Sequence, residues 1–284
     1  MKLLILGASG MIGSTLFRVI SDKSDHQVFG SVRDAACKEF FPPLHRERII
    51  SQIDLTQFDS LVNILELVNP DIVINCVGIT KHIISFEDPL TSIPINSILP
   101  HRLVRLCRLM GARLIHISTD CVFTGKKGNY KERDFPDAVD IYGRSKILGE
   151  VDSPHAITLR TSTIGHELQT KYGLLEWFLS QGGACKGFGG ALFSGLPTVV
   201  LAQIIRDIVI PRNELHGLYH VGAEPINKFE LLGLIAECYQ KDIEIIRDDS
   251  FRIDRSLNSD RFRLATGYEP PSWPELIKLM HAYK

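Results

Sequence analysis

The sequence predicts an α/β fold with a parallel, doubly wound sheet, and two regularities support this prediction. Short runs rich in Ile, Val and Leu alternate with helical patterns through the first 165 residues. These runs are continuously apolar, which is typical of strands that helices cover on both faces. Strict alternation of strand and helix further implies right-handed crossovers between parallel strands.

Six segments are the expected strands, and two helices between them carry end signals. The strand segments are residues 2–7, 26–32, 48–55, 71–78, 113–119 and 156–162. Thr56, with Asp59 three residues on and Pro70 past the end, predicts a capped helix and its stop. A second helix begins near Leu99 and runs into Gly111, a typical C-terminal cap.

The alternation loosens beyond about residue 165, which predicts a second and smaller part of the chain. We expect a first domain over residues 1–165 and a C-terminal lobe over residues 166–284. Residues 216–222 are expected to return one strand to the sheet. The lobe contains the glycine-rich residues 180–190, and its expected helices lie within residues 195–210, 228–240 and 267–280.

Composition argues against several classes of protein. Lys and Arg number 32 against 33 Asp and Glu, so the net charge of -1 creates no general field for nucleic acid or an anionic membrane. No apolar run approaches the roughly 20 residues that cross a bilayer, and glycines interrupt the first apolar run too early for a signal peptide.

The cysteines and histidines predict neither a metal site nor a disulfide framework. The six cysteines lie far apart without a C-x-x-C pair, which suits a reducing cytoplasm. Four histidines lack the spacing of metal ligands: His82, His116, His166 and His220.

A glycine turn follows the first strand, at the place where a helix should begin. Such a turn lets backbone amides and the helix N-terminus approach a pyrophosphate closely. The spacing G-x-x-G-x-x-G differs by one residue from the usual dinucleotide fingerprint, and a tight turn that binds nothing is the alternative. Its place at the first strand-to-helix junction favours a nucleotide cofactor. The expected contacts are Gly7, Ser9, Gly10, Met11, Ile12 and Gly13.

The end of the second strand bears on which nicotinamide cofactor binds. An acidic residue there would accept hydrogen bonds from the ribose 2′-hydroxyl, whereas an arginine would face a 2′-phosphate. Arg33 stands nearer the strand end than Asp34, which favours NADPH and leaves NADH possible. Asp54 is expected near the adenine, or as a cap for the following helix. Further cofactor contacts are expected at the ends of the third and fourth strands: Leu55, Cys76, Val77 and Gly78.

Tyr142 and Lys146 lie four residues apart on an expected helix and can project from one face. The pKa of a free phenol is near about 10, and an adjacent ammonium lowers it, so such a tyrosine can pass a proton. The Y-x-x-x-K pattern alone is common. Its position after the fifth strand, where ligands bind in such sheets, makes it significant.

Hydroxyl groups end the fifth strand. Ser118, Thr119 and Asp120 stand there, and a hydroxyl could reach the same substrate oxygen as Tyr142. The alternative is that these side chains cap the turn backbone. We favour Thr119 as functional because the glycine turn, the tyrosine–lysine pair and this strand end converge on one edge.

In this order, "GASGMIG", "INCVG", "HISTDCVFTG", "YGRSK" and "LRTS" resemble the extended short-chain dehydrogenase/reductase superfamily, which has a Rossmann-like domain. More narrowly, the chain resembles the dTDP-4-dehydrorhamnose reductase family of nucleotide-sugar 4-keto reductases. The segments "FSGLPTVVLAQII", "GLYHVGAEPINKFEL" and "DRSLNSDRFRLATGYEPPSW" extend the resemblance over nearly the whole chain.

The resemblance implies a mechanism. NADPH would deliver hydride to the C4 ketone of a nucleotide-activated 4-keto-6-deoxy sugar, in deoxysugar or surface polysaccharide precursor synthesis. Tyr142 would protonate the oxygen, Thr119 would hold it, and Lys146 would bind the nicotinamide ribose as well as lower the tyrosine pKa. The first domain would bind the dinucleotide and the lobe the substrate.

The resemblance also implies substrate contacts, and this sequence departs from the family near some of them. The family commonly has an aromatic residue where Cys121 stands, and an Asp-Gln pair where this chain has Phe193 and Ser194. Related 4,6-dehydratases use Thr-Asp-Glu, so Cys121 removes the carboxylate that dehydration needs. Salt bridges and turns are alternative roles for several of the expected contacts, which are Ser118, Asp120, Cys121, Arg160, Gly195, Pro197, Thr198, Arg255 and Asn258.

Two other functions stay open at this point. The superfamily contains non-catalytic cofactor-binding regulatory subunits and NAD-dependent nucleotide-sugar epimerases. The complete set of Thr119, Tyr142 and Lys146 favours catalysis. We expect a cytoplasmic protein whose partner is a nucleotide sugar rather than nucleic acid or a membrane, with a homodimer possible.

Overall fold

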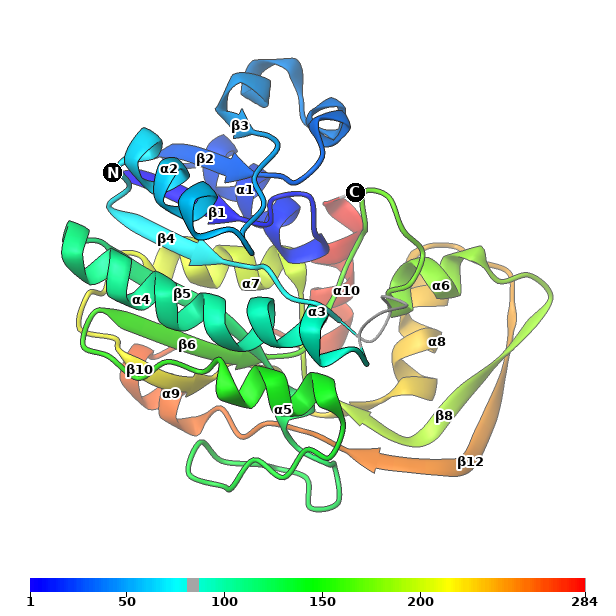
Figure 1. The fold of residues 1–284 in the computed structure, drawn as a ribbon. Coiled ribbons are helices and arrows are strands. Elements are labelled where there is room, and N and C mark those ends of the chain that lie inside the picture. Colours follow the sequence, from blue (N-terminus) through cyan, green and yellow to red (C-terminus); the bar gives the residue numbers. More distant parts are fainter. Residues whose placement is uncertain (81–86, 284) are drawn as a thin grey trace. The chain divides into compact units, whose positions relative to one another are not determined.

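A computed structural model describes residues 1–80 and 87–283 (Figure 1). It contains two compact units that interleave along the chain. The first unit comprises Met1–Ser118, Val139–Leu159 and Ala202–Leu218. The second comprises Thr119–Ala138, Arg160–Leu201 and Tyr219–Lys284. The chain therefore passes between the units several times, and not only near residue 165.

A seven-stranded sheet has the order β10-β6-β5-β4-β1-β2-β3. β1 pairs in parallel with β2 and β4, β2 with β3, and β4 with β5, which confirms the predicted parallel, doubly wound sheet. Each predicted strand segment contains one of these strands. The bounds are β1 (Lys2–Leu6), β2 (Gln27–Ser31), β3 (Ile49–Ile50), β4 (Ile72–Asn75), β5 (Arg113–Thr119), β6 (Ala156–Thr161) and β10 (Gly217–His220).

Helices cover both faces of the part of this sheet that lies in the first unit. On one face, Leu61 of α2 and Leu103 of α4 belong to an apolar core with Leu4 and Leu114 of the strands. On the other, the Arg206 guanidinium donates to the Val19 carbonyl of α1 at 3.4 Å. The helices are α1 (Met11–Asp22), η1 (Ala35–Phe40), η2 (Pro43–Arg48), α2 (Phe58–Val68), α3 (Pro89–Ile93), η3 (Pro94–Ile98), α4 (Leu99–Met110), α5 (Ile141–Leu148), α7 (Thr198–Ile204) and η5 (Ile205–Val209). None of the helices in the described ranges is long and apolar enough to span a bilayer.

The ends of two helices test the capping signals. Gly111 ends α4 with φ of 70°, which confirms the predicted cap. The predicted cap at Thr56 is wrong, because α2 begins after Gln57 without a side-chain cap. Thr56 instead donates from its backbone N–H and its hydroxyl to Asp54 Oδ1, at 3.0 and 2.7 Å.

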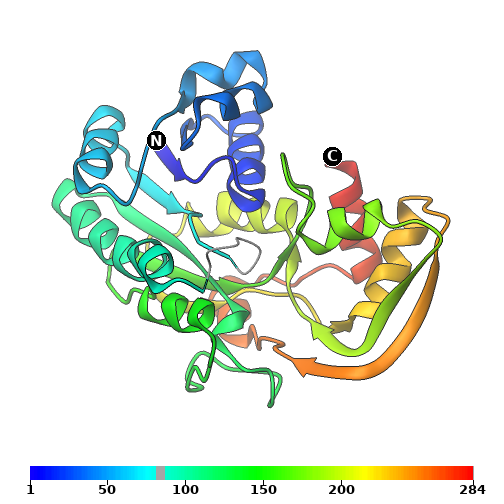
Figure 2. The same cartoon turned by 45° about the vertical axis from the view of Figure 1, so that its right-hand side comes forward.

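The second unit is built on a three-stranded sheet of order β11-β8-β12. β8 runs antiparallel to β11 and parallel to β12, and β8 and β12 lie side by side as a long ribbon (Figures 1 and 2). The elements are η4 (Asp120–Val122), β7 (Thr163–Ile164), α6 (Leu174–Ser180), β8 (Ala184–Phe193), β9 (Leu196–Pro197), β11 (Ile226–Asn227), α8 (Lys228–Cys238), β12 (Glu244–Asp254), α9 (Asp260–Thr266) and α10 (Trp273–Ala282).

The glycine-rich residues 180–190 lie largely in β8, for a packing reason. A Cβ at Gly187 would stand 3.0 Å from the Cα of Phe229, so its absence lets the backbone of α8 approach the strand. The expected helices in residues 195–210, 228–240 and 267–280 are confirmed as α7 with η5, α8 and α10.

Candidate active site

The glycine turn between β1 and α1 needs glycine for two physical reasons. Gly7 has φ of 80°, in the left-handed region that favours glycine. At Gly13 a Cβ would overlap the carbonyl group of Gly7. The Gly7 N–H donates to Ser31 Oγ at 3.2 Å, and Gly10 begins α1 without a side-chain cap. The first amides of α1, which include those of Met11 and Ile12, are thus suited to an anion.

The two charged residues after β2 are used differently. Asp34 caps η1 by accepting a hydrogen bond from the Ala36 N–H at 2.9 Å. Arg33 is exposed and has no hydrogen bond or ion pair within the part of the chain that the structure describes. Hydrogen bonds from Thr56 lower the pKa of Asp54, and the nearby Arg33 lowers it further. Arg33 is therefore the residue whose charge is available to a ligand.

The segment after β4 lies against the glycine turn. A Cβ on Gly7 would stand 2.9 Å from Val77 Cγ2, so the two residues are in close contact. The Val77 N–H donates to the Asn75 side chain at 3.1 Å. Burial raises the pKa of the Cys76 thiol to about 12, which keeps it protonated. The structure therefore brings the expected residues of this segment together with the glycine turn.

Helix α5 carries Tyr142 and Lys146 and is capped by Asp140, which accepts from the Gly143 N–H at 2.9 Å. Lys146 is 4% exposed, and its Nζ donates to the Ile117 carbonyl of β5 at 2.7 Å. Burial lowers the Lys146 pKa to about 8, against the opposing effect of Glu150 and Cys76. The helix thus holds a cation in the interior, one turn after Tyr142.

Three buried polar residues that the sequence did not single out anchor α5. The Asn96 amide donates to Ser145 Oγ at 3.0 Å, and Ser97 Oγ donates to the Ser145 carbonyl at 2.8 Å. Ser145 Oγ also donates to the Tyr142 carbonyl at 2.9 Å. Asn96 further bonds both backbone groups of Ile79, in the segment after β4. These bonds position the tyrosine–lysine helix against η3.

Ser118 and Thr119 end β5 with different partners. Ser118 Oγ donates to Glu150 Oε1 at 2.8 Å within the first unit. In the second unit, Thr119 Oγ1 accepts from the Cys121 N–H at 3.1 Å and donates to Asp120 Oδ1 at 3.2 Å. Burial raises the Asp120 pKa, and the charge of Arg255 opposes that rise. The Thr119 hydroxyl therefore caps this turn, which is the alternative role that the sequence allows.

Arg255 is held beside the same turn. Its Nε donates to the Phe123 carbonyl at 2.8 Å, and one terminal nitrogen lies 3.7 Å from Cys121 Sγ. Asp120, Cys121 and Arg255 thus form one cluster. Asn258 lies elsewhere: its side chain accepts from the Asp260 N–H at 3.1 Å at the start of α9.

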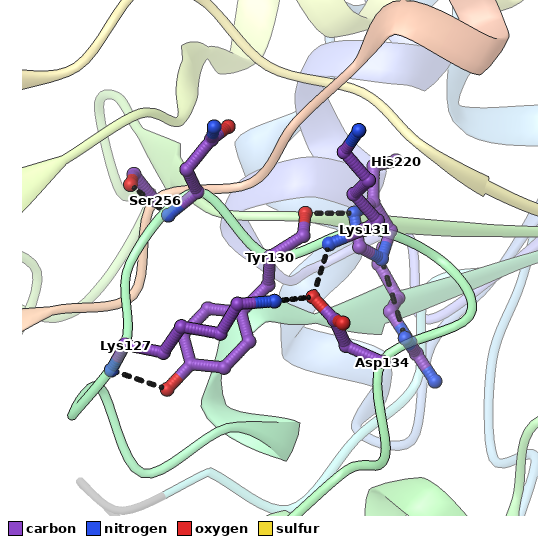
Figure 3. A network of polar contacts seen from close by, with 8 residues as sticks. Lys127, Tyr130, Lys131, Asp134, His220 and Ser256 are labelled. Atoms are coloured by element: carbon purple, nitrogen blue, oxygen red, sulfur yellow. Dashed lines mark hydrogen bonds and ion pairs between the residues drawn. The ribbon is translucent and has the colours of Figure 1, made fainter.

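Arg160 belongs to a buried network in the second unit. It is 2% exposed, donates to His220 Nε2 at 3.2 Å and lies 5.2 Å from the centre of the Phe123 ring. His220 Nδ1 donates to the Tyr130 carbonyl at 3.0 Å, as Figure 3 shows. Burial lowers the His220 pKa to about 3, so the ring is neutral. This network ties β10 to β6 and to the loop that contains Tyr130.

The remaining expected substrate residues pack against residues 162–165. A Cβ at Gly195 would overlap the Ser162 carbonyl oxygen, and Pro197 pairs with Ile164 between β9 and β7. Thr198 is buried beside Gly165. No three His, Cys, Asp or Glu residues gather as metal ligands in the ranges 1–80 and 87–283, and His82 lies outside them.

The doubly wound sheet, the glycine turn and the tyrosine–lysine helix define a fold of the extended short-chain dehydrogenase/reductase type. Within that class, the chain belongs to the family described as RmlD substrate binding domain, whose model matches residues 1–280. This membership confirms the resemblance drawn from the sequence motifs.

Several individual proteins are also similar to this chain. dTDP-4-dehydrorhamnose reductase from Aggregatibacter actinomycetemcomitans is 25% identical over 307 residues, covering 99% of each chain. A solved structure of dTDP-4-dehydrorhamnose reductase from Bacillus anthracis, in complex with NADP, has a TM-score of 0.81 and 21% identity, covering 100% of this chain and 99% of that one. Methionine adenosyltransferase 2 subunit beta from Bos taurus is 26% identical over 149 residues, 52% of this chain and 41% of the relative.

The buried ammonium of Lys146 predicts how stability depends on pH. Its pKa falls from 10.5 to about 8 on folding, so between those values the unfolded chain binds more protons than the folded chain. The free energy of unfolding therefore rises with pH across that window. We expect it to rise by about 1–3 kcal/mol more in the wild type than in Lys146→Met, measured by urea unfolding from about pH 7 to 10. Parallel curves for the two proteins would show that the ammonium is not buried as described.

Proposed function

We propose that the protein is an NADPH-dependent reductase of a nucleotide-activated 4-keto-6-deoxy sugar. The observation that carries this proposal is the buried Lys146 ammonium, bonded to Ile117 one helical turn after Tyr142 and in the same unit as the glycine turn. Membership of the family supports the substrate class. So does the name of the Aggregatibacter relative, which aligns over 99% of both chains.

The first unit fits the cofactor. The glycine turn presents backbone rather than side chains to the pyrophosphate, and the exposed Arg33 would pair with a 2′-phosphate. NADPH, when bound, supplies the hydride. Ser9, Val77, Gly78 and Leu55 complete the cofactor contacts of the proposal.

The chain's own residues supply the proton. Tyr142 donates it to the oxygen of the ketone as hydride reaches the carbon. An ammonium has three N–H donors, and the Ile117 carbonyl takes one, so Lys146 retains donors for the nicotinamide ribose and the Tyr142 phenol. In the second unit, Thr119 is the proposed hydroxyl donor to the substrate, a role that requires its hydrogen to turn away from Asp120.

The residues beside Asp120 in the second unit fit a reductase better than a dehydratase. Elimination of water needs a carboxylate next to Asp120, and Cys121 stands there beside Arg255. All six cysteines are free, which suits a reducing compartment, so we place the activity in the cytoplasm, in deoxysugar or surface polysaccharide precursor synthesis. A homodimer is part of the same proposal.

The function is tested by replacing Tyr142 with Phe. We expect the rate of NADPH oxidation with a 4-keto-6-deoxy nucleotide sugar to fall about 10²- to 10⁴-fold, because the ketone oxygen loses its acid. NADPH affinity, measured by titration of cofactor fluorescence, should change little because Lys146 and the glycine turn remain. Equal rates in the two proteins would exclude Tyr142 as the acid.

The same assay separates the second candidate, a cofactor-binding regulatory subunit. That candidate is favoured by the similarity to methionine adenosyltransferase 2 subunit beta. A wild-type protein that binds NADPH and reduces no nucleotide sugar would support it. An epimerase would instead co-purify with its cofactor and convert sugar without net oxidation.

Cofactor preference is tested by replacing Arg33 with Ala. Losing a charged partner of the 2′-phosphate should raise the KM for NADPH about tenfold to hundredfold and leave the KM for NADH nearly unchanged. Lys23→Ala, at the exposed end of α1, is the matched control for loss of one surface cation. If Arg33→Ala and the control behave alike, Arg33 does not face the 2′-phosphate.

A further inference from the structure

His116 is a buried histidine whose two ring nitrogens have different surroundings. It lies in β5, where the register places it opposite Asn75 of β4, and it is 0% exposed. Its Nδ1 lies 3.1 Å from Asn75 Nδ2. Its Nε2 is also buried and has no hydrogen-bond partner within residues 1–80 and 87–283. The polar contact through which this side chain can act is therefore the one with Asn75.

The neighbouring backbone decides which nitrogen of His116 carries the hydrogen. Asn75 Oδ1 accepts a hydrogen bond from the Val77 N–H at 3.1 Å, so the oxygen of this amide points toward Val77. The amide nitrogen, which only donates, then faces His116. A neutral imidazole has one donor nitrogen and one acceptor nitrogen. Nδ1 of His116 is therefore the acceptor, and Nε2 carries the hydrogen.

The same Val77 backbone lies against the glycine turn. A Cβ on Gly7 would stand 3.4 Å from the Val77 backbone nitrogen and 2.9 Å from Val77 Cγ2. A continuous series of contacts within the first unit thus joins His116, Asn75, Val77 and Gly7. A rotation of the Asn75 amide would release the Val77 N–H beside Gly7, at the turn proposed to hold the pyrophosphate.

Packing alone does not account for a histidine at this position. An apolar side chain of similar size would fill the same space without leaving a buried N–H unsatisfied, which costs free energy. Burial lowers the His116 pKa well below 6.5, and the charges of Lys146 and His101 lower it further. The ring is therefore neutral at pH 7, and Nδ1 keeps the lone pair that accepts from Asn75.

We propose that His116 is a positioning residue for cofactor binding: by accepting from the Asn75 amide, it fixes the Val77 backbone where the glycine turn receives the pyrophosphate. This inference rests on the proposed function for the identity of the cofactor, NADPH. His116 acts through Asn75 rather than by contact with the cofactor. Without the acceptor the Asn75 amide is free to rotate, so it must be ordered when NADPH binds, and affinity falls. The loss appears in cofactor binding and not in the chemical step.

The experiment compares wild type, His116→Leu and His116→Gln by titration of cofactor fluorescence and by turnover. Leu removes the acceptor, and Gln keeps one in its side-chain carbonyl. We expect His116→Leu to weaken NADPH binding about threefold to tenfold, the effect of losing one neutral hydrogen bond, with kcat at saturating NADPH within about twofold. His116→Gln should recover most of the affinity. His216→Leu, at an exposed position of the same unit, is the matched control.

Two further measurements separate positioning from a structural role. Because His116 acts through Asn75, a double variant with Asn75→Ala and His116→Leu should bind NADPH no more weakly than Asn75→Ala alone. In the wild type, NMR of isotope-labelled histidine should show the His116 hydrogen on Nε2. The spectrum of His116→Gln identifies the signal, because that signal is missing from it.

Three outcomes would overturn the inference. Equal NADPH affinity in wild type and His116→Leu would make the histidine a packing residue, a loss that His116→Gln does not recover would make its role structural, and a hydrogen on Nδ1 would remove the acceptor. His116→Met, which has no strong acceptor, provides a second variant if His116→Leu fails to fold. A wild-type protein that does not bind NADPH would refute the proposed function itself, a result that is visible before any variant is made.

Discussion

The hydrogen bond from the buried Lys146 ammonium to the Ile117 carbonyl is the interaction on which the proposed chemistry of the first unit depends. One hydrogen bond to a carbonyl offsets only part of the free energy that burying a cation costs. That local cost is typical of functional sites, where proteins depart from the rules that hold elsewhere. The hydrogen bond to Ile117 forms only if α5 is held at a fixed position. The hydrogen bonds among Asn96, Ser97 and Ser145 hold this helix of only eight residues in place.

In the same unit, backbone geometry restricts which residues can stand in the glycine turn. Gly7 adopts a conformation that favours glycine, and Gly13 meets the Gly7 carbonyl too closely for any side chain. At the end of β2, the Asp34 carboxylate caps η1, whereas Arg33 has no hydrogen bond or ion pair among the described residues. The proposed role of Arg33 toward a 2′-phosphate rests on this difference between two adjacent charged residues.

The sequence predicted the strands of the first unit, the Gly111 cap, the glycine turn and the helix of Tyr142, because each depends on neighbours in the chain. It did not predict β12. Apolar and charged residues do not alternate regularly along this exposed edge strand, and its pairing with β8 holds it in place. It could not show that Arg160 bonds His220, 60 residues away, or that Asn96 reaches Ser145, 49 residues away.

The most direct measurement of the central claim follows the hydride itself. The purified protein is incubated with a dTDP-4-keto-6-deoxy sugar and with NADPH that carries deuterium in place of the hydride to be transferred from C4 of the nicotinamide ring. The product is analysed by mass spectrometry and NMR. We predict one deuterium on C4 of the sugar for each NADPH oxidised. A sugar that stays unlabelled while NADPH is bound would contradict it.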